Sequence, residues 1–441
     1  MVGRFIKDSF ITFNTRILQL VLGLGSSVII ARVLGPGGVG VYSLAILLPA
    51  FLTLFTQLGV GSASVFFIGK KKYSLKEIFG TNIIFSVFIS IFAILIGLII
   101  ISFFNSILFP NIEKEYLFLA LSLIPFQLFL NFAVDILLGM QKIKKYNFIQ
   151  LMHTLIFLFL ITIFLLGFHF GIKAAIIAQT ISIAIACIIL FLTTKKETKG
   201  LSFSFNKNLF KDFLSYGSKI YLGNIATFLY TRINMWMINI FLSPLAVGFY
   251  SIAVKLSEQI WLISQAGGTI LFPRVSSETD GKRLKDFTPL VCRNVLFITF
   301  LIALALSFLG HRIIILLYSE EYSASVLPFQ ILLIGSLAVS GSRILTNDLA
   351  GRGRPMINTY IAIITLVVNI LLNIILIPQF GIIGVAWATV ISYTSMLLLK
   401  TVIYSKISNN RIIDIIFIKK TDFKFYKNFL GMIMNKLKNK R

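Results

Sequence analysis

A twelve-residue motif occurs twice in this sequence and relates one half of the chain to the other. Leu34–Ala45 reads LGPGGVGVYSLA, and Leu242–Ala253, 208 residues further on, reads LSPLAVGFYSIA. The two copies are identical at seven of their twelve positions. The same offset pairs Gln57 with Gln265. Because self-similarity at a fixed spacing is typical of duplicated architectures, we predict that the chain consists of two homologous halves.

A second pair of similar segments supports this division. Gly171–Ser182 and Gly381–Ser392 lie 210 residues apart and follow the first pair in the same order. We therefore expect an N-terminal unit at residues 1–200, a C-terminal unit at residues 201–405 and a basic tail at residues 406–441. Two forms of the tail remain open: an amphipathic helix on the membrane surface, or an unstructured terminus.

The composition excludes a water-soluble globule. The chain has 441 residues, of which 57% are apolar and 13% charged, whereas soluble domains carry about 25% charged residues. The net charge of +25 is spread over short segments between long apolar runs, so we expect no nucleic-acid partner. Cys187 and Cys292 lie in apolar runs without His or Cys at ligand spacing, which indicates neither a disulfide framework nor a zinc site.

The apolar runs predict an all-α, polytopic membrane protein, because runs of 18 or more apolar residues are candidates for membrane-spanning helices. An even number of spans in each half returns the chain to its starting side, so the two six-helix repeats must be parallel. The twelve predicted spans are residues 10–34, 41–68, 79–104, 116–138, 147–168, 174–192, 213–242, 248–272, 287–310, 324–348, 357–377 and 382–404.

The distribution of Lys and Arg predicts the orientation of these spans. Thirty basic residues fall on the side that holds both termini and four on the other. Cytoplasmic loops carry the excess of Lys and Arg, so both termini are expected in the cytoplasm. The LGPGGVG turn then faces outward.

Polar side chains form stripes along several spans and predict a water-accessible cavity between the halves. Arg16 and Lys219 occupy equivalent places, since Phe13–Ile17 (FNTRI) corresponds to Tyr216–Ile220 (YGSKI). Two like charges at such sites repel each other unless an anion lies between them, and both residue types bind phosphate. The alternative is that both side chains extend to the lipid headgroups.

Further charged residues lie within the spans. Lys255 and Glu258 are three residues apart on one helix face, so either they neutralise each other or Lys255 binds an anion. Arg343 has no acid on its own face and is therefore a stronger anion ligand. Together with the polar stripes of the seventh and eighth spans, this gives a predicted substrate-binding set of Arg16, Lys219, Asn224, Lys255, Gln265 and Arg343.

Acidic residues inside the membrane are the candidates for coupling transport to Na⁺ or H⁺, because intramembrane ionisable groups are commonly functional. These are Asp135, Glu258 and Asp348. We find no phosphate-binding loop, HExxH motif or GxSxG motif. No catalytic residue, metal site or other cofactor is predicted, and the chain is not expected to be an enzyme.

Four segments resemble bacterial polysaccharide flippases of the O-antigen type, which belong to the multidrug/oligosaccharidyl-lipid/polysaccharide exporter superfamily. They are Ala31–Ala45, Gln57–Ala63, Gly139–Asn147 and Ala350–Asn358, and the resemblance extends over about residues 1–405. It implies two six-helix lobes around a V-shaped central cavity in the bacterial inner membrane. It also implies a substrate of undecaprenyl-pyrophosphate-linked oligosaccharide, moved from the cytoplasmic to the outer leaflet by alternating access.

The resemblance further implies that cationic cavity residues hold the pyrophosphate or acidic sugars. The matching residues are Arg16, Lys219, Lys255 and Arg343. Such a flippase would deliver its substrate to a polysaccharide polymerase. Export of capsule, teichuronic acid or peptidoglycan precursors would leave the same pattern.

A cation-coupled multidrug exporter of the same superfamily is the alternative function. It would favour an acid-lined cavity, whereas the candidate cavity bases outnumber the candidate acids six to three. The six bases are Arg16, Lys219, Arg232, Lys255, Arg293 and Arg343. A membrane-embedded transferase is a third class, and it would predict clustered Asp, Glu or His at a membrane face.

Overall fold

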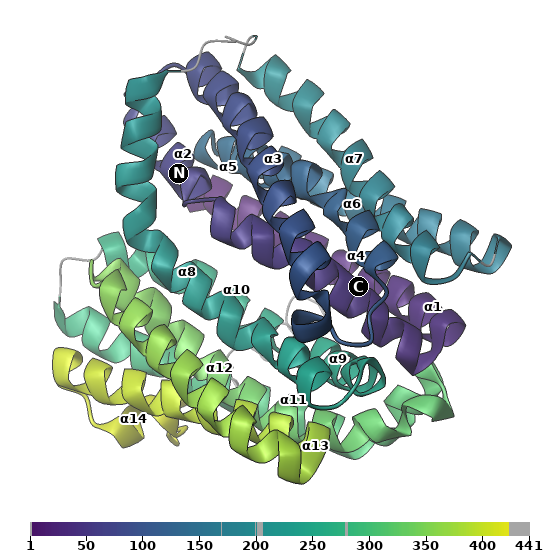
Figure 1. The fold of residues 1–441 in the computed structure, drawn as a ribbon. Coiled ribbons are helices and arrows are strands. Elements are labelled where there is room, and N and C mark those ends of the chain that lie inside the picture. Colours follow the sequence, from purple (N-terminus) through teal and green to yellow (C-terminus); the bar gives the residue numbers. More distant parts are fainter. Residues whose placement is uncertain (1, 169, 199, 201–205, 278–280, 423–441) are drawn as a thin grey trace, which may run out of the picture.

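The computed structural model describes residues 2–168, 170–198, 200, 206–277 and 281–422. These residues form helices and connecting turns without a β-strand, which confirms the all-α prediction (Figure 1). In chain order the helices are α1 (Val2–Thr56), α2 (Val60–Lys70), α3 (Leu75–Leu108), α4 (Lys114–Leu121), α5 (Leu123–Gly139), α6 (Ile143–Thr162), η1 (Ile163–Gly167), α7 (Gly171–Glu197), α8 (Lys207–Phe241), α9 (Pro244–Glu258), α10 (Trp261–Ser277), α11 (Gly281–Tyr318), η2 (Glu320–Ser325), α12 (Val326–Gly351), α13 (Pro355–Ser408) and α14 (Ile412–Ile416).

Eight helical stretches of the described chain are long and apolar enough to cross a membrane. Two of them, Ile11–Thr56 and Pro355–Ser408, contain 46 and 54 residues, whereas one crossing needs about 20. Each is kinked at a glycine with a left-handed backbone, Gly35 at φ 64° and Gly381 at φ 57°, and is long enough for two crossings. With α8 and the consecutive pair α9–α10, the arrangement comes close to the twelve predicted spans.

Three predicted spans are divided in the structure: span 116–138 only by a one-residue turn at Ser122 between α4 and α5, and two others at breaks described below. The predicted span 41–68 ends at Thr56, because Leu58 and Gly59 adopt positive φ angles of 51° and 73°. The predicted span 248–272 is divided between α9 and α10. There the Gln259 side-chain amide donates to the Lys255 carbonyl at 2.7 Å and satisfies one of the backbone acceptors that a helix end leaves free.

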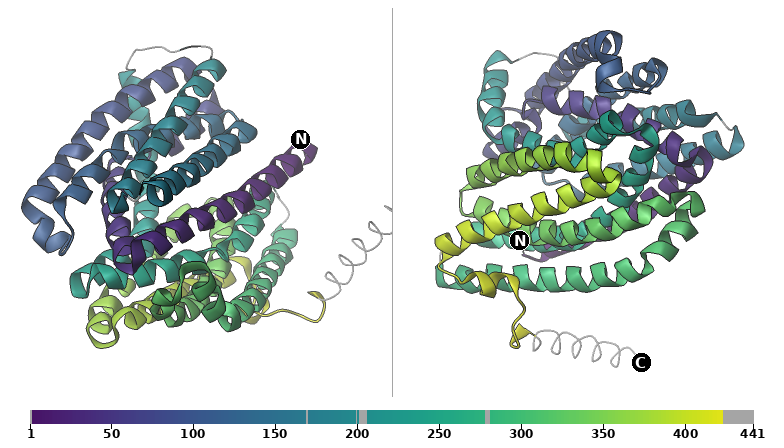
Figure 2. Two further views of the ribbon diagram at one scale, coloured as in Figure 1. Left: turned by 90° about the vertical axis from the view of Figure 1, so that its right-hand side faces the viewer. Right: turned by 60° about the horizontal axis from the view of Figure 1, so that its bottom comes forward.

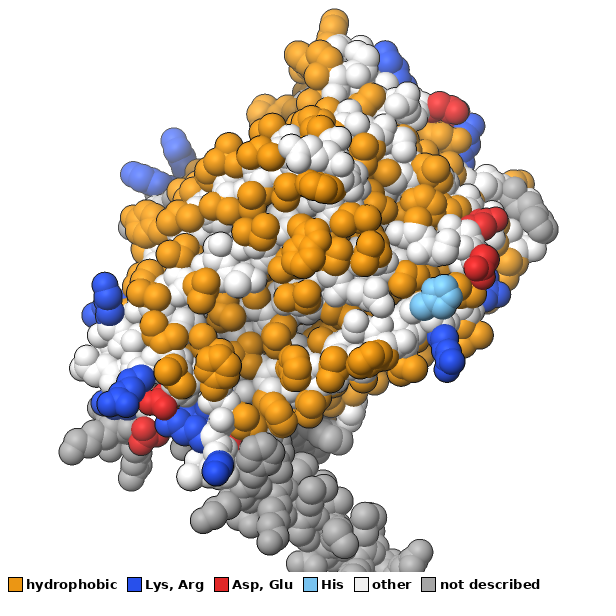
Figure 3. All heavy atoms as spheres, turned by 90° about the horizontal axis from the view of Figure 1, so that it is seen from below, with side chains coloured by type: hydrophobic (Ala, Val, Ile, Leu, Met, Phe, Trp, Pro, Cys, Tyr) orange, Lys and Arg blue, Asp and Glu red, His pale blue; other side chains and the backbone are white. Residues whose placement is uncertain are grey.

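The helices form two bundles, α1–α7 and α8–α14, which we call the N-terminal and C-terminal halves (Figure 1). The long α1 runs along the seam between them (Figure 2). The first turns of α8 cross the seam and lie against α2 and α3. Large apolar side chains such as Phe103 and Phe308 are 76% and 80% exposed, as expected for a surface in contact with lipid. Figure 3 shows one such face, with basic side chains toward its margins.

The duplicated motif lies where the halves meet. A Cβ atom added to Gly40 would stand 1.7 Å from the carbonyl oxygen of Pro244, and one added to Gly248 would stand 1.9 Å from that of Pro36. Each copy of the motif therefore packs its glycine against the proline of the other copy. On the same side, the Tyr322 hydroxyl donates to the Ala31 carbonyl at 3.1 Å. Backbone contact thus closes this end of the seam.

The other end of the seam is closed between α2 and the start of α8. A Cβ on Gly59 would stand 2.6 Å from the carbonyl oxygen of Gly217. The rings of Phe66 and Tyr216 stack at 4.1 Å. Asp212 accepts hydrogen bonds from Lys72 at 2.5 Å and from the Tyr73 hydroxyl at 2.6 Å. Contacts therefore join the halves at both ends of the seam.

Candidate functional site

A cavity of about 370 Å³ lies between the halves, walled by α1 on one side and by α9 and α10 on the other. Its apolar walls are leucine and glycine, and the described lining contains no acidic residue. Five polar side chains face it: Arg16, Gln19, Lys255, Gln259 and Gln265. Three of these belong to the predicted substrate-binding set, and they come from both halves.

Arg16 joins the two walls of the cavity. Its Nη1 atom donates a hydrogen bond to Oε1 of Gln265 at 2.6 Å. The bond connects residues 249 positions apart, one in each half. Because the donor carries a charge, this hydrogen bond is of the stronger kind.

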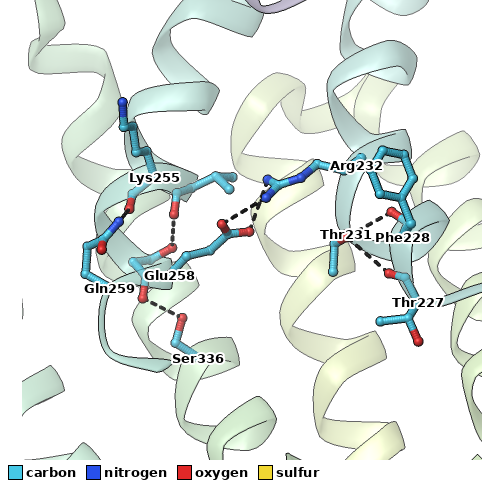
Figure 4. A network of polar contacts seen from close by, with 10 residues as sticks. Thr227, Phe228, Thr231, Arg232, Lys255, Glu258, Gln259 and Ser336 are labelled. Atoms are coloured by element: carbon cyan, nitrogen blue, oxygen red, sulfur yellow. Dashed lines mark hydrogen bonds and ion pairs between the residues drawn. The ribbon is translucent and has the colours of Figure 1, made fainter. Parts of the chain in front are cut away.

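The second cation of the cavity has no counter-ion. Within the described part of the chain, the Lys255 ammonium has no hydrogen-bond or ion-pair partner, and its side chain points away from Glu258 (Figure 4). Glu258 instead binds Arg232 of α8 through two hydrogen bonds of 3.2 and 3.1 Å. Mutual neutralisation of Lys255 and Glu258, one of the two readings left open by the sequence, is therefore not the arrangement seen.

Arg343 lies near the cavity but does not line it. Its guanidinium carbon stands 4.5 Å from the centre of the Trp261 ring, a cation–π contact. The predicted anion ligand Arg343 thus contacts an aromatic ring of α10 rather than the open space of the cavity.

The remaining members of the predicted binding set lie apart. Asn224 is exposed on α8 and is not part of the cavity wall. The side chain of Lys219 lies outside the described part of the structure, so its pairing with Arg16 stays a prediction.

The three predicted coupling acids have different surroundings. Glu258 is paired with Arg232, as described above. Asp348 is fully buried, accepts a hydrogen bond from Thr288 at 2.5 Å and forms an ion pair with Arg352. Asp135 has neither a hydrogen bond nor an ion pair with any described residue. Its carboxylate occupies a notch made by Gly61, where a Cβ would stand 1.9 Å from Oδ2.

Part of the polar stripes serves the interior of the C-terminal half rather than the cavity. Asn373 donates to Asn234 at 2.7 Å and to Asn369 at 3.1 Å, and Asn234 donates to Thr389 at 3.0 Å. All four side chains are buried. The sequence pattern could not distinguish such a buried network from the lining of a water-filled cavity, because both place polar residues on one helix face.

Two basic residues have roles that the sequence pattern did not indicate. Arg293 is held by Asp422 of the C-terminal segment at 2.5 and 2.7 Å, so its charge is compensated. Lys400 is buried in α13, and its described partners are two hydroxyl groups, those of Ser342 at 2.9 Å and Thr346 at 2.7 Å. The signal for Lys400 was its position as a single lysine inside the last apolar run.

The fold and the cavity together define a polytopic α-helical membrane protein in which two repeated bundles enclose a basic site. Residues 29–327 match the polysaccharide biosynthesis protein family, and the chain belongs to that family.

Relatives of known sequence come from archaea and bacteria. An uncharacterized membrane protein of Methanocaldococcus jannaschii is 26% identical over 79% of this chain and 85% of its own length. A capsular polysaccharide biosynthesis protein of Staphylococcus aureus is 23% identical over 88% of this chain and 96% of its own. A probable low-salt glycan biosynthesis flippase of Haloferax volcanii is 27% identical over 44% and 42%.

Solved structures share the fold. The lipid II flippase MurJ in an inward closed conformation superposes with a TM-score of 0.77 and 18% identity over 93% of this chain and 89% of its own. An inward-facing multidrug resistance MATE family transporter gives a TM-score of 0.72 and 15% identity over 91% and 99%. These neighbours confirm the predicted all-α, MATE-like membrane fold of about twelve spans.

Proposed function

We propose that the protein is a flippase for lipid-linked oligosaccharide, with undecaprenyl-pyrophosphate-linked repeat units as its substrate. One observation carries this proposal: Arg16 and Lys255, one from each half, face the same cavity, and its described lining contains no acid. Basic groups on both walls suit a diphosphate, which has several acceptor oxygens and more than one negative charge. A cation exporter, the alternative function, would need a carboxylate in the cavity, and the described lining contains none.

The relatives support the same class of substrate. Family membership places the chain in polysaccharide biosynthesis, and two proteins of Haloferax volcanii that it resembles are described as probable flippases. The structural neighbour MurJ is a flippase for lipid II. Glycan or polysaccharide biosynthesis and flipping are the terms that recur in these descriptions.

Transport would proceed by opening the two closed ends of the seam alternately. The cavity of about 370 Å³ is at the lower end of the roughly 300–1,000 Å³ typical of ligand pockets, so an oligosaccharide requires the halves to separate. The diphosphate would lie between Arg16 and Lys255 while the isoprenyl chain stays in the bilayer beside α1. With both termini in the cytoplasm, substrate would load at the α2–α8 end, move to the outer leaflet, and pass to a polymerase.

Ion coupling, with Na⁺ or H⁺, is assigned in this proposal to Asp135. Of the three candidate acids it alone has no partner within the described chain, whereas Glu258 and Asp348 are held by arginines. An unpaired carboxylate inside a membrane bundle is costly unless it binds a cation, which is the property that a coupling site requires.

The function can be tested with purified protein in liposomes that contain a fluorescent oligosaccharide on an isoprenyl diphosphate. Access of a membrane-impermeant quencher reports flipping. We expect the double variant Arg16→Ala, Lys255→Ala to lose at least about tenfold in rate, because each charge-assisted hydrogen bond contributes about 1.5–3 kcal/mol. Lys173→Ala is the matched control, since this cation is exposed and pairs with Glu115. Wild-type flipping by the double variant would disprove the proposed site.

A further inference from the structure

The hydrogen bond between Arg16 and Gln265 joins residues 13–25 of α1 to the C-terminal half. Among residues 13–25 of α1, the described structure shows no other hydrogen bond or ion pair to the C-terminal half. Beyond this segment, from Ser27 onward, α1 makes several such bonds, including that of Ser27 with Tyr318 at 3.2 Å. Among the described residues, residues 13–25 of α1 are therefore joined to the C-terminal half by one side-chain hydrogen bond.

The equivalent glutamine of the other half makes no such tie. Gln57 corresponds to Gln265 in the duplicated sequence, but its side chain has no hydrogen-bond partner within the described chain. On its side the halves are held by the backbone of Gly59 and Gly217 and by the stacked rings of Phe66 and Tyr216. The duplicated halves thus meet differently on the two sides of the seam, by extended packing near Gln57 and by one amide at Gln265.

An anion can replace the Gln265 amide as the hydrogen-bond acceptor of Arg16. The Gln265 oxygen gives the Arg16 guanidinium one neutral acceptor at 2.6 Å. A phosphate offers charged oxygens in the spacing that a guanidinium binds through two parallel hydrogen bonds. Lys255 faces the same cavity without a partner among the described residues. Its positive charge attracts an anion but does not strengthen the bond of Arg16 to the neutral amide. An entering diphosphate is therefore favoured over Gln265 as the ligand of Arg16.

We propose that Gln265 occupies the phosphate position in the empty protein and acts as a latch between the halves, which the substrate diphosphate releases by taking over Arg16. The inference rests on the proposed function and adds to it the event that couples binding to opening. Gln265 is then a positioning residue: it holds residues 13–25 of α1 against the C-terminal half until an anion arrives, and the loss of its bond allows this segment to move away.

The latch can be tested by measuring a distance across the seam in full-length protein in nanodiscs. Spin labels at Asn14→Cys and Lys285→Cys, both exposed positions in opposite halves, report the separation after the buried Cys187 and Cys292 are replaced by alanine. The probes are farnesyl diphosphate and inorganic pyrophosphate. We expect the parent protein to show a longer distance with diphosphate. A longer distance with both probes would mean that the diphosphate is sufficient to release the latch. A longer distance with farnesyl diphosphate but not with pyrophosphate would mean that the isoprenyl chain is needed as well.

Two substitutions of Gln265 should have opposite effects on the latch: one releases it and the other holds it. Gln265→Ala is expected to give the long distance without ligand, to retain diphosphate binding, and to show no further change. Gln265→Glu forms an ion pair with Arg16 and should keep the short distance even at tenfold higher ligand concentration. Gln57→Ala removes the same chemical group at the equivalent position and should behave as the parent.

The outcomes separate this inference from the proposed function. If the parent binds diphosphate but Gln265→Ala has the same distances as the parent with and without ligand, the latch is disproved and the flippase proposal stands. If the parent binds neither probe, the proposed function fails and the latch fails with it.

Discussion

Gly40 and Gly248 occupy equivalent positions in the two halves, and each lies against the backbone of the other half's motif, at Pro244 and Pro36 respectively. The contact is reciprocal, as a two-fold relation between duplicated halves requires. Neither position has space for a Cβ, and a backbone carbonyl cannot move aside as a flexible side chain can. The motif that revealed the duplication is thus also the surface at which the two copies join.

Substitution of Gly40 by alanine is expected to force the halves apart at this end. Overpacking of a close contact costs about 1–3 kcal/mol, so we predict a lower unfolding temperature and faster thiol labelling of a Ser27→Cys reporter. Gly37→Ala is the control from the same motif, because a Cβ there meets nothing within 4 Å. Equal labelling and equal stability of the two variants would contradict the role of Gly40.

Replacement of Lys255 by methionine should separate stability from function. The ammonium has no partner among the described residues, and an uncompensated charge in a protein interior is destabilising. We therefore expect Lys255→Met to unfold at a temperature several degrees higher while binding diphosphate about 10–100-fold more weakly, which corresponds to a lost charged hydrogen bond of about 1.5–3 kcal/mol. Thermal unfolding and calorimetric titration provide the two measurements. A variant that is both less stable and fully active would be inconsistent with an unpaired functional cation.

Asp135→Asn is expected to uncouple flipping from the ion gradient. The amide fills the same notch beside Gly61 but cannot bind a proton or take a full negative charge. Flipping should continue at the rate seen without a gradient and should no longer respond to an imposed Na⁺ or H⁺ gradient. Glu115→Gln is the control, since this acid is 60% exposed and pairs with Lys173 at the surface. If gradient-driven flipping by Asp135→Asn equals that of the parent, coupling does not occur at this residue.

The α2–α8 contact should weaken in acid. Hydrogen bonds from Lys72 and Tyr73 hold the pKa of Asp212 below its ordinary value, which is about 3.9 for an unperturbed Asp. A lowered carboxyl pKa means that the contact is fully formed above about pH 4 and is lost as the pH falls through the lowered value. The effect is small, because Lys72 is 54% exposed and such pairs are weak.

Spin labels on α2 and α8 would measure this change, because their separation can be read at any pH. We expect the distance in the parent to lengthen as the pH is taken below 4, whereas Asp212→Asn should show the longer distance at neutral pH and lack the acid-dependent step. An acid-dependent step that persists in Asp212→Asn would assign the titration to another group.

Several features of this protein could be predicted from its sequence because they depend on local composition or repetition. Long apolar runs indicate membrane helices wherever they occur, and two similar motifs indicate duplicated halves. Arg16, Lys255 and Gln265 were identified as polar residues on span faces, and all three line the cavity. The breaks at Leu58–Gly59 and at Gln259 were missed, because apolarity continues through both turns.

The partners of charged residues, by contrast, come from remote parts of the chain. Glu258 pairs with Arg232, 26 residues away, and Arg293 pairs with Asp422, 129 residues away. Sequence neighbours suggested Lys255 for Glu258 and no partner for Arg293. Arg232 and Arg293 are therefore neutralised. Fewer of the six bases that favoured an anionic substrate thus contribute an uncompensated charge to the cavity.

The sequence by itself determined that the chain lies in a membrane, is helical and is built twice, since hydrophobic burial in lipid and backbone hydrogen bonding within each helix depend only on residues near one another. Tertiary structure decided which charges are compensated and which face open space. That choice depends on contacts between helices hundreds of residues apart, where a shift of a few ångströms makes or breaks an ion pair. Arg16 and Lys255 form a site only because α1 and α9 close around the same cavity.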